Sequence, residues 1–249
     1  MTTRIYISGD SSAVAVGADE VVQAIIARAD QRGVAIEIIR NGSRGMCWLE
    51  PLVEVVTDEG RVGYGPIEVN EVAALFDADF LHGGAHALRI GVVDQMPWML
   101  GQERLCYRRV GITDPLSLDD YAAHGGWNGL RAALAHSCEQ IVATITDSGL
   151  RGRGGAAFPT GIKWNTVLGT STDQKYIVCN ADEGDSGTYS DRMLMEGDPY
   201  LLIEGMAIAG LAVGATRGYI YLRSEYPLAF RVLDAAIDRA RAAGWLGDN

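Results

Sequence analysis

Gly-Leu-Arg-Gly-Arg-Gly-Gly-Ala-Ala-Phe-Pro-Thr-Gly-Ile-Lys-Trp, residues 149–164, is the most informative stretch of the chain. Glycine lets the backbone turn through positive φ and bring its N–H groups close to a phosphate. Arg151, Arg153 and Lys163 would supply the compensating positive charge. The stretch therefore predicts an anion-binding loop.

Three other interpretations of this loop are considered. A Walker A loop is excluded because Gly-Lys must stand together before Ser or Thr, whereas Ile162 separates Gly161 from Lys163. A dinucleotide fingerprint of the form G-x-G-x-x-A stays open, with residues 152–157 as the motif and 141–145 as the preceding strand. A surface loop with solvated arginines is the remaining alternative.

A second polar cluster, Asn-Ala-Asp-Glu-Gly-Asp-Ser-Gly at residues 180–187, directly follows a predicted buried strand at residues 176–179. Side chains at the carboxyl end of a strand in an open α/β sheet face the ligand crevice. The cluster therefore predicts contacts to a cofactor, and an acidic Asx-type turn is the alternative. Its spacing lacks the D-x-D-x-D-G order of an EF-hand, so a metal is discounted.

Both clusters resemble those of one family, the flavin-bearing NADH-oxidising or NAD-reducing subunits of respiratory complex I, NAD-linked hydrogenase diaphorases and NAD-dependent molybdenum or tungsten formate dehydrogenases. The family motifs look like Arg-Gly-Arg-Gly-Gly-Ala-Gly-Phe-Pro-Thr-Gly-Leu-Lys-Trp and Asn-Ala-Asp-Glu-Gly-Asp/Glu-x-Gly-Thr, and this chain is similar in both. Further similar segments are residues 109–111, 114–121, 191–192, 197–199 and 219–221.

The resemblance implies an NAD(H):acceptor oxidoreductase in which hydride passes between NAD(H) and FMN and electrons then pass singly to iron–sulfur clusters. No side chain is expected to be catalytic, because the cofactors carry the chemistry. Expected FMN contacts are Gly152, Arg153, Gly154, Gly155, Lys163, Asn180, Asp182 and Glu183. Expected NAD contacts are Phe158, Glu183 and Asp185, whose carboxylates would disfavour the 2′-phosphate of NADP.

Two departures from the family pattern qualify this expectation. Ala157 stands where the family usually has glycine, and its Cβ narrows the room for a nucleotide to approach the backbone closely. The family's second nucleotide motif and the cysteines of its [4Fe–4S] cluster do not appear before Asn249. We therefore expect that the chain is the N-terminal part of a longer polypeptide, whose missing C-terminal part carries the [4Fe–4S] cluster. We expect this segment alone to bind FMN weakly or not at all.

Composition limits the class of protein. The chain has 21 basic and 32 acidic residues and a net charge of −11, which argues against a nucleic-acid partner. No stretch approaches about 18 uninterrupted apolar residues and no signal peptide is evident, so we expect no transmembrane segment and a cytoplasmic location. The four cysteines form no Cys-x-x-Cys pair, so no metal site is predicted.

We expect an α/β fold with two domains joined by a connector. Residues 1–83 predict a thioredoxin-like domain, 84–116 a connector, and 117–249 the N-terminal part of an FMN/NADH-binding domain that is incomplete at its C-terminus. In the first domain the expected elements are strands at 4–7, 34–39, 52–56 and 61–64 and helices at 19–32 and 68–80. In the second they are a buried helix between Pro199 and Gly214, a strand at 219–222 and a helix at 227–243.

The first domain also resembles the thioredoxin-like [2Fe–2S] domain that accompanies these flavin subunits. The paired cysteines of that domain are missing, because Asp10, Ser11 and Ser12 occupy the first loop and Ser43 leaves only Cys47 in the second. One thiolate cannot hold the cluster, so the domain is expected to dock a partner that carries it. Within the connector, packing of Trp98, Met99 and Leu100 on a partner or on the core stays open.

The domain without a cluster and the Asp185-Ser186 pair make the β subunit of a cytoplasmic NAD-dependent formate dehydrogenase the nearest resemblance. Its partners would be an iron–sulfur subunit with a [2Fe–2S] thioredoxin-like domain and a large molybdopterin and iron–sulfur catalytic subunit. The flavin subunit of a complex I or of an NAD-reducing hydrogenase is an alternative. An assembly or docking subunit without catalysis is the alternative of another class.

Overall fold

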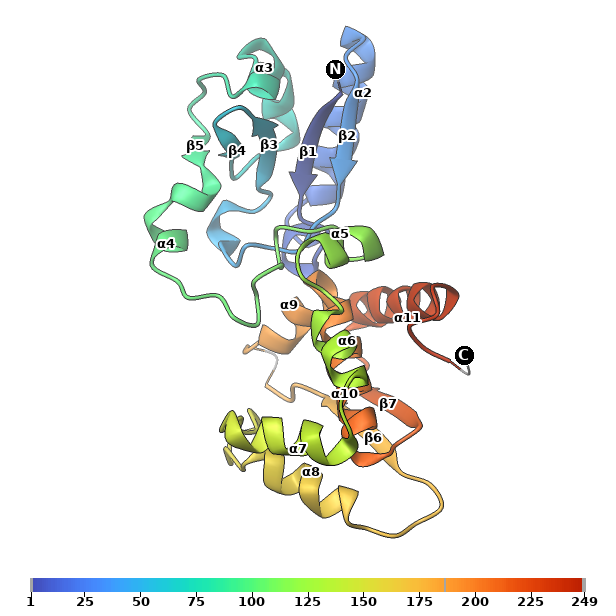
Figure 1. The fold of residues 1–249 in the computed structure, drawn as a ribbon. Helices are drawn as coiled ribbons and strands as arrows, with labels where there is room; N and C mark the ends of the chain where they lie inside the picture. The colour runs from blue at the N-terminus through green and yellow to red at the C-terminus, as the bar shows by residue number, and fades with distance from the viewer. Residues whose placement is uncertain (1, 186, 248–249) are drawn as a thin grey trace. The chain divides into compact units, whose positions relative to one another are not determined.

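The computed structural model describes residues 2–185 and 187–247, so Ser186 of the predicted ligand loop lies outside the described residues. The chain folds into two compact units (Figure 1). Unit 1 comprises residues 1–117 with 193–198, and unit 2 comprises residues 118–192 with 199–249. Each unit is an α/β structure, as the sequence predicts.

Unit 1 is built on a five-stranded mixed sheet of order β2-β1-β3-β4-β5. The strands are β1 (Thr3–Ile7), β2 (Ile36–Ile39), β3 (Val53–Thr57), β4 (Gly60–Tyr64) and β5 (Arg89–Val92). The helices are α1 (Ser11–Val14), α2 (Ala18–Arg32), α3 (Val72–Asp77) and α4 (Pro97–Leu100), with 3₁₀ helices at Cys47–Leu49, Val69–Glu71, Phe80–His82 and Val93–Gln95. β1 and β2 run parallel and the other pairs antiparallel, which confirms the predicted thioredoxin-like order.

Helix α2 covers one face of this sheet because its apolar residues recur with the helical period. Val21, Val22, Ile25 and Ala29 are buried in the same core cluster as strand residues such as Ile5. Fully burying one such aliphatic side chain stabilises a fold by about 1.5–3 kcal/mol. The helix ends at Gly33, as predicted, because φ of 64° there is a left-handed conformation that glycine adopts without a Cβ clash.

The helix predicted over residues 68–80 is wrong as one continuous element. It is divided into a 3₁₀ turn at Val69–Glu71, helix α3 and a second 3₁₀ turn at Phe80–His82. The break falls at Asp79, whose φ of 54° lies in the left-handed region. The apolar period still places Phe76 and Phe80 in the core, where their rings meet edge to face, so periodicity alone did not reveal the break.

Residues 84–116, expected as a connector, contribute β5 and α4 to unit 1. The sequence left open whether Trp98, Met99 and Leu100 pack on the core or on a partner, and the structure places only one of them in the core. Met99 packs into a buried cluster with Met46, while Trp98 and Leu100 are 51% and 71% exposed. Trp98 lies edge to face against Trp48, which is also half exposed.

The two loops that lack cysteines are closed by hydrogen bonds within unit 1. Asp10 caps α1 by accepting from the Ala13 N–H at 3.0 Å. The N–H and Oγ of Ser11 donate to the carboxylate of Glu196 at 2.8 and 2.6 Å. In the second loop, Ser43 Oγ donates to Glu50 Oε1 at 2.8 Å.

Glu50 should make the stability of the chain depend on pH. Burial, followed by the carboxylates of Asp10 and Glu54, raises its pKa from 4.5 to about 7 against the hydrogen bonds from Ser43 and the Leu52 N–H. Because the folded-state pKa lies above the unfolded value, this contribution is full below pH 4.5 and is lost as the pH rises through about 7. We expect Glu50→Gln to recover up to about 3 kcal/mol of unfolding free energy at alkaline pH relative to acid pH.

Urea denaturation on both sides of this pH window measures the effect. Glu20→Gln is the matched control, because Glu20 is exposed on α2. The control should keep the pH dependence of the wild-type chain. If Glu50→Gln keeps it as well, the buried carboxyl is not its source.

Unit 2 contains a parallel pair of strands, β6 (Tyr176–Ala181) and β7 (Arg217–Leu222). Its helices are α5 (Leu118–Ala123), α6 (Asn128–Leu134), α7 (Cys138–Asp147), α8 (Thr160–Leu168), α9 (Ser190–Gly197), α10 (Pro199–Val213) and α11 (Pro227–Ala242). The last residues of α9 belong to unit 1. α7 and α8 lie side by side, and α10 packs against both (Figure 1).

The predicted bracket around α10 is confirmed. Pro199 is its first residue, and Gly214 follows its end with φ of 75°. Asp198, the residue before the helix, accepts from Arg109 Nε at 2.9 Å. No helix in the described part of the chain is long and apolar enough to cross a membrane.

Glu204 is a buried carboxylate in the middle of the apolar helix α10. Its oxygens accept from the Tyr121 hydroxyl and from the N–H groups of Trp127, at 2.8 Å, and Leu130, at 2.9 Å. A Cβ on Gly129 would come within 3.0 Å of this carboxylate, so glycine leaves room for it. Glu204, which belongs to α10, therefore accepts hydrogen bonds from backbone N–H groups at the start of α6 that have no partner within that helix.

Candidate functional site

The glycine-rich loop joins α7 to α8, and this connection decides between the interpretations of its sequence. Residues 141–145 lie in helix α7, whose start is capped by Ser137. The dinucleotide fingerprint, the alternative left open above, is therefore excluded, because that motif needs a strand before the glycines. The apolar run could not distinguish a helix from a strand, since short apolar runs suit either element.

The loop is closed at its base and open at its tip. The Gly152 N–H donates to the Phe158 carbonyl, and the Thr160 N–H donates to the Leu150 carbonyl, each at 2.9 Å. At the tip, a Cβ built on Gly154 or on Gly155 would meet no atom within 4 Å. The backbone of the tip is thus accessible to a ligand.

Ala157 shows why the family favours glycine at this position. Its φ of 50° is left-handed, which costs roughly 1–2 kcal/mol for a residue with a Cβ. The carbonyl of Ala157 accepts from Arg151 Nη1 at 3.0 Å. Arg151 therefore braces the loop.

Arg153 and Lys163 are the two cations that remain available. Both are exposed, and in the part of the chain that the structure describes neither side chain forms a hydrogen bond or an ion pair. Helix α8 begins at Thr160 with no side chain capping its first turn. The N–H groups of an uncapped first turn attract anions, so charge and backbone both favour a negative group here.

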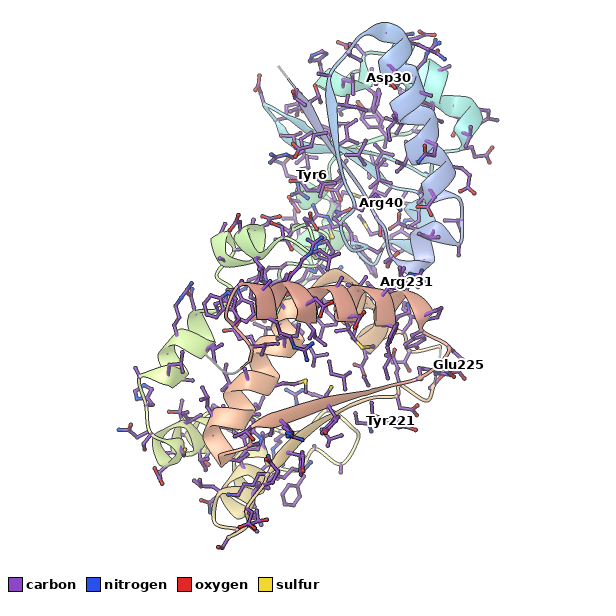
Figure 2. The ribbon with its side chains drawn as sticks, turned by 90° about the vertical axis from the view of Figure 1, so that its right-hand side faces the viewer. Tyr6, Asp30, Arg40, Tyr221, Glu225 and Arg231 are labelled. Carbon is purple, nitrogen blue, oxygen red and sulfur yellow. The ribbon has the colours of Figure 1, made fainter. Side chains whose placement is uncertain are left out.

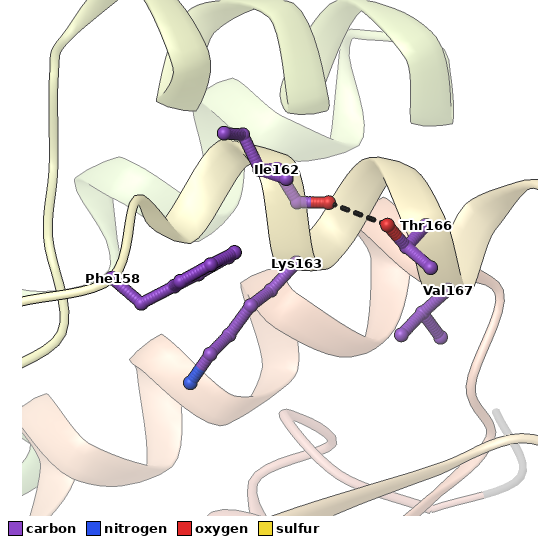
Figure 3. A pocket seen from close by; sticks show the side chains of 5 residues that line it. All are labelled: Phe158, Ile162, Lys163, Thr166 and Val167. Atoms are coloured by element: carbon purple, nitrogen blue, oxygen red, sulfur yellow. Dashed lines mark hydrogen bonds between the residues drawn. The ribbon is translucent and has the colours of Figure 1, made fainter. Parts of the chain in front are cut away.

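One face of α8 adds an apolar pocket to this charged end. Phe158, Ile162, Lys163, Thr166 and Val167 line an open pocket of about 460 Å³. Figure 3 shows Phe158 and Lys163 beside one another, with Val167 one turn further along the helix. Phe158 is 46% exposed, so its ring is available for stacking. The volume of this open pocket lies within the range of small-ligand sites, and its lining is mostly apolar.

The strand predicted at residues 176–179 is confirmed as part of β6, which extends through Ala181, but the prediction that it is buried is wrong, because Tyr176 and Val178 are 49% and 64% exposed. The rest of the polar cluster follows β6, and local turns use part of its bonding capacity. Asn180 Oδ1 accepts from the Asp182 N–H at 3.1 Å, and Asp185 Oδ1 accepts from the Gly187 N–H at 3.0 Å. These are the Asx-type turns of the alternative interpretation. Asp182 and Asp185 nevertheless remain exposed.

Glu183 binds its own chain. Its carboxylate accepts from Ser190 Oγ at 3.1 Å, from the N–H groups of Asp191 and Arg192 at 2.8 and 3.1 Å, and from the Tyr226 hydroxyl at 2.9 Å. Burial opposes its ionisation, but these hydrogen bonds outweigh burial and lower the pKa of Glu183. Sequence reasoning missed Tyr226, because nothing in the local pattern connects positions 43 residues apart.

The predicted residues thus form two sets within unit 2. Residues 152–155, Phe158 and Lys163 lie on the glycine-rich loop and α8, and the second set, Asn180 to Asp185, lies at the end of β6 and in the loop after it. Among the described residues, no hydrogen bond or ion pair joins the two sets. The described ranges also contain no group of three His, Cys, Asp or Glu side chains that could hold a metal ion, and all four cysteines are free.

Comparison with protein families identifies the segment that carries both sets. Residues 145–247 match the family described as the Nuo51 FMN-binding domain. The match includes the glycine-rich loop, the loop after β6 and helix α11. This confirms the resemblance of the two motifs to FMN-binding subunits, while the nearer resemblance to formate dehydrogenase stays a prediction.

Curated relatives agree with this match. The NADP-reducing hydrogenase subunit HndC of Solidesulfovibrio fructosivorans is 54% identical over 148 residues, which are 59% of this chain and 30% of that protein. The F 2 subunit of NADH-quinone oxidoreductase from Rhizobium meliloti is 46% identical over 146 residues, 58% of this chain and 35% of the relative. The chain thus spans about a third of the length of the curated relatives it matches.

Two solved structures are similar to this chain at low identity. The superposition on a chain of an air-oxidised NAD⁺-reducing [NiFe]-hydrogenase covers 98% of this chain and 41% of the hydrogenase chain, at 22% identity and a TM-score of 0.47. The superposition on a thioredoxin-like [2Fe–2S] ferredoxin from Aquifex aeolicus covers 36% of this chain and 97% of the ferredoxin, at 20% identity and a TM-score of 0.31.

Proposed function

We propose that the chain, whose residues 145–247 belong to the Nuo51 FMN-binding domain family, holds the phosphate of FMN on its glycine-rich loop. The observation that carries the proposal is an open glycine backbone beside two exposed cations, Arg153 and Lys163, that have no partner among the described residues. Gly154 and Gly155 would bring backbone N–H groups to the phosphate, whereas the Gly152 N–H already donates to the Phe158 carbonyl and closes the base of the loop. The residues present therefore fit this group.

The remaining predicted residues would orient the ring systems. Phe158 presents an exposed ring at the pocket for stacking, and Asn180 and Asp182 would face the flavin. Bound FMN would accept hydride from NADH and pass electrons on singly. Asp185 keeps an exposed carboxylate that would repel the 2′-phosphate of NADP, which favours NAD.

We propose that the chain acts as the diaphorase-type subunit of a cytoplasmic NAD-dependent formate dehydrogenase. The support is a thioredoxin-like unit without cluster cysteines, which would dock an iron–sulfur subunit carrying a [2Fe–2S] domain. A molybdopterin subunit would then supply the electrons. The 54% identity to HndC, a subunit of an NADP-reducing hydrogenase, makes the flavin subunit of a hydrogenase assembly the second candidate. Molybdenum or tungsten in the purified complex would support the first candidate, and hydrogen-dependent reduction of the nucleotide by a complex without either metal would support the second.

FMN binding is tested by titrating the purified chain with FMN up to millimolar concentration and following flavin fluorescence. Of weak binding and no binding, the two outcomes expected from the sequence, the open backbone at Gly154 and Gly155 favours weak but saturable binding. Riboflavin, which lacks the phosphate, should bind at least about tenfold more weakly, because hydrogen bonds to a charged group contribute about 1.5–3 kcal/mol. Equal affinity for both flavins would contradict a phosphate site on the glycine-rich loop.

A further inference from the structure

Glu183 holds a conformation that must be stabilised by its surroundings. Its φ of 34° lies in the left-handed region, where a non-glycine residue is costly by roughly 1–3 kcal/mol. Asp182 and Gly184 on either side of it are exposed, while the Glu183 side chain turns back toward α9. The conformation of this one residue therefore sets the direction of the loop after β6.

Contacts to Glu183 come from two different elements. Ser190, Asp191 and Arg192 belong to the first turn of α9, where a carboxylate satisfies free N–H groups and complements the helix dipole. Arg223 and Tyr226 follow β7, and Arg223 Nη1 donates to the Glu183 carbonyl. The side chain and backbone of Glu183 are thus both held from the β7 side.

The β7 side reaches Glu183 because the two strands end together. Ala181 pairs with Leu222 at the carboxyl ends of the parallel strands. Figure 2 shows Tyr221 on β7 and Glu225 at the turn that leads into α11. Tyr226 comes next and is 6% exposed. The Tyr226 hydroxyl therefore bonds the loop after β6 to the turn after β7 at the edge where α/β sheets bind ligands.

We propose that Tyr226 is a positioning residue for the flavin site, which acts by holding the Glu183 carboxylate and thereby the loop that follows β6. The inference rests on the proposed FMN function, since it assigns Tyr226 to the same site. Tyr226 touches no ligand in this role. It keeps Asn180 and Asp182 oriented while Glu183 stays strained.

Charged groups around Glu183 support this role. Asp191 on α9 raises the cost of its ionisation, while Arg192 on α9 and Arg223 after β7 bring positive charge. Burial and then the bond to Glu183 raise the pKa of Tyr226, so its hydroxyl stays protonated and donating at neutral pH. Loss of this donor would let the pKa of Glu183 rise toward its ordinary value.

The test compares Tyr226→Phe with wild type by FMN titration. We expect about tenfold weaker FMN binding at neutral pH, the usual worth of one hydrogen bond to a charged group. The ratio of the two dissociation constants should grow as the pH falls from about 5 to about 4, because the pKa of Glu183, lowered in wild type, would lie nearer its ordinary value of 4.5 in the variant. Protonation of the FMN phosphate changes both dissociation constants equally, so it does not change their ratio.

Tyr221→Phe is the matched control, because Tyr221 is 67% exposed and no hydrogen bond of its hydroxyl is recorded among the described residues. It should bind FMN like wild type. Unchanged affinity in Tyr226→Phe, a ratio that is flat with pH, or loss of helix content together with affinity would each overturn the positioning role. Failure of wild type to bind FMN would instead refute the proposed function.

Discussion

Replacing Arg153 and Lys163 together by alanine is expected to weaken FMN binding by about a hundredfold or more. Each cation would donate to the phosphate, and a hydrogen bond to a charged group contributes about 1.5–3 kcal/mol. Two such losses correspond to about two powers of ten in the dissociation constant. Neither side chain has a partner among the described residues, so the double variant should retain the unfolding temperature of wild type.

The measurement is the FMN titration, repeated with riboflavin. Riboflavin affinity should not change in the double variant, because the removed charges would act on the phosphate alone. Arg217→Ala with Arg231→Ala is the matched control, since both arginines are exposed in unit 2 and their removal changes the net charge equally. If both double variants lose FMN affinity equally, general electrostatic attraction explains the binding and the glycine-rich loop does not.

Glu204→Ala is expected to lower the free energy of unfolding by about 3 kcal/mol or more. Three buried donors, the Tyr121 hydroxyl and the N–H groups of Trp127 and Leu130, would lose their acceptor, and each unsatisfied group costs about 1–3 kcal/mol. Because Glu204 stands in α10, the loss would also loosen the packing of α6. Urea denaturation followed by far-ultraviolet circular dichroism measures the change.

Two comparisons separate this role from a general effect of charge. Asp234→Ala removes an exposed carboxylate from α11 and should stay within about 0.5 kcal/mol of wild type. Glu204→Gln keeps one carbonyl oxygen as acceptor and should lose less stability than Glu204→Ala. A Glu204→Ala chain as stable as the Asp234→Ala control would show that water satisfies the three donors instead.

Local chemistry explains what could be predicted before the fold was known. Gly33 and Gly214 end helices because the conformation they adopt is available to glycine from its own covalent structure. The stripe of Val21, Val22 and Ile25 predicted α2 because the helical period is a local property. The glycine-rich loop and the cluster after β6 could be assigned to ligand binding on the same basis, from residue types and their spacing.

Long-range contacts decided the rest. Residues 141–145 became helix because they pack with α8 and α10, and a short apolar run suits a helix or a strand equally. Met99 and Trp98 are neighbours in sequence, but only the packing around Met46 assigns one to the core and leaves the other half exposed.

The sequence by itself determined the glycine-rich loop, the polar turn after β6, the main helix boundaries and the α/β class, because these depend on interactions between residues close in the chain. Only the tertiary structure decided which polar groups in those loops stay available. Arg151 and Glu183 read from sequence as site residues, yet Arg151 braces its loop and Glu183 is held by α9 and Tyr226. A side chain can bind a ligand only through donors and acceptors that are not already hydrogen-bonded within the protein, and residues distant in sequence decide which ones those are.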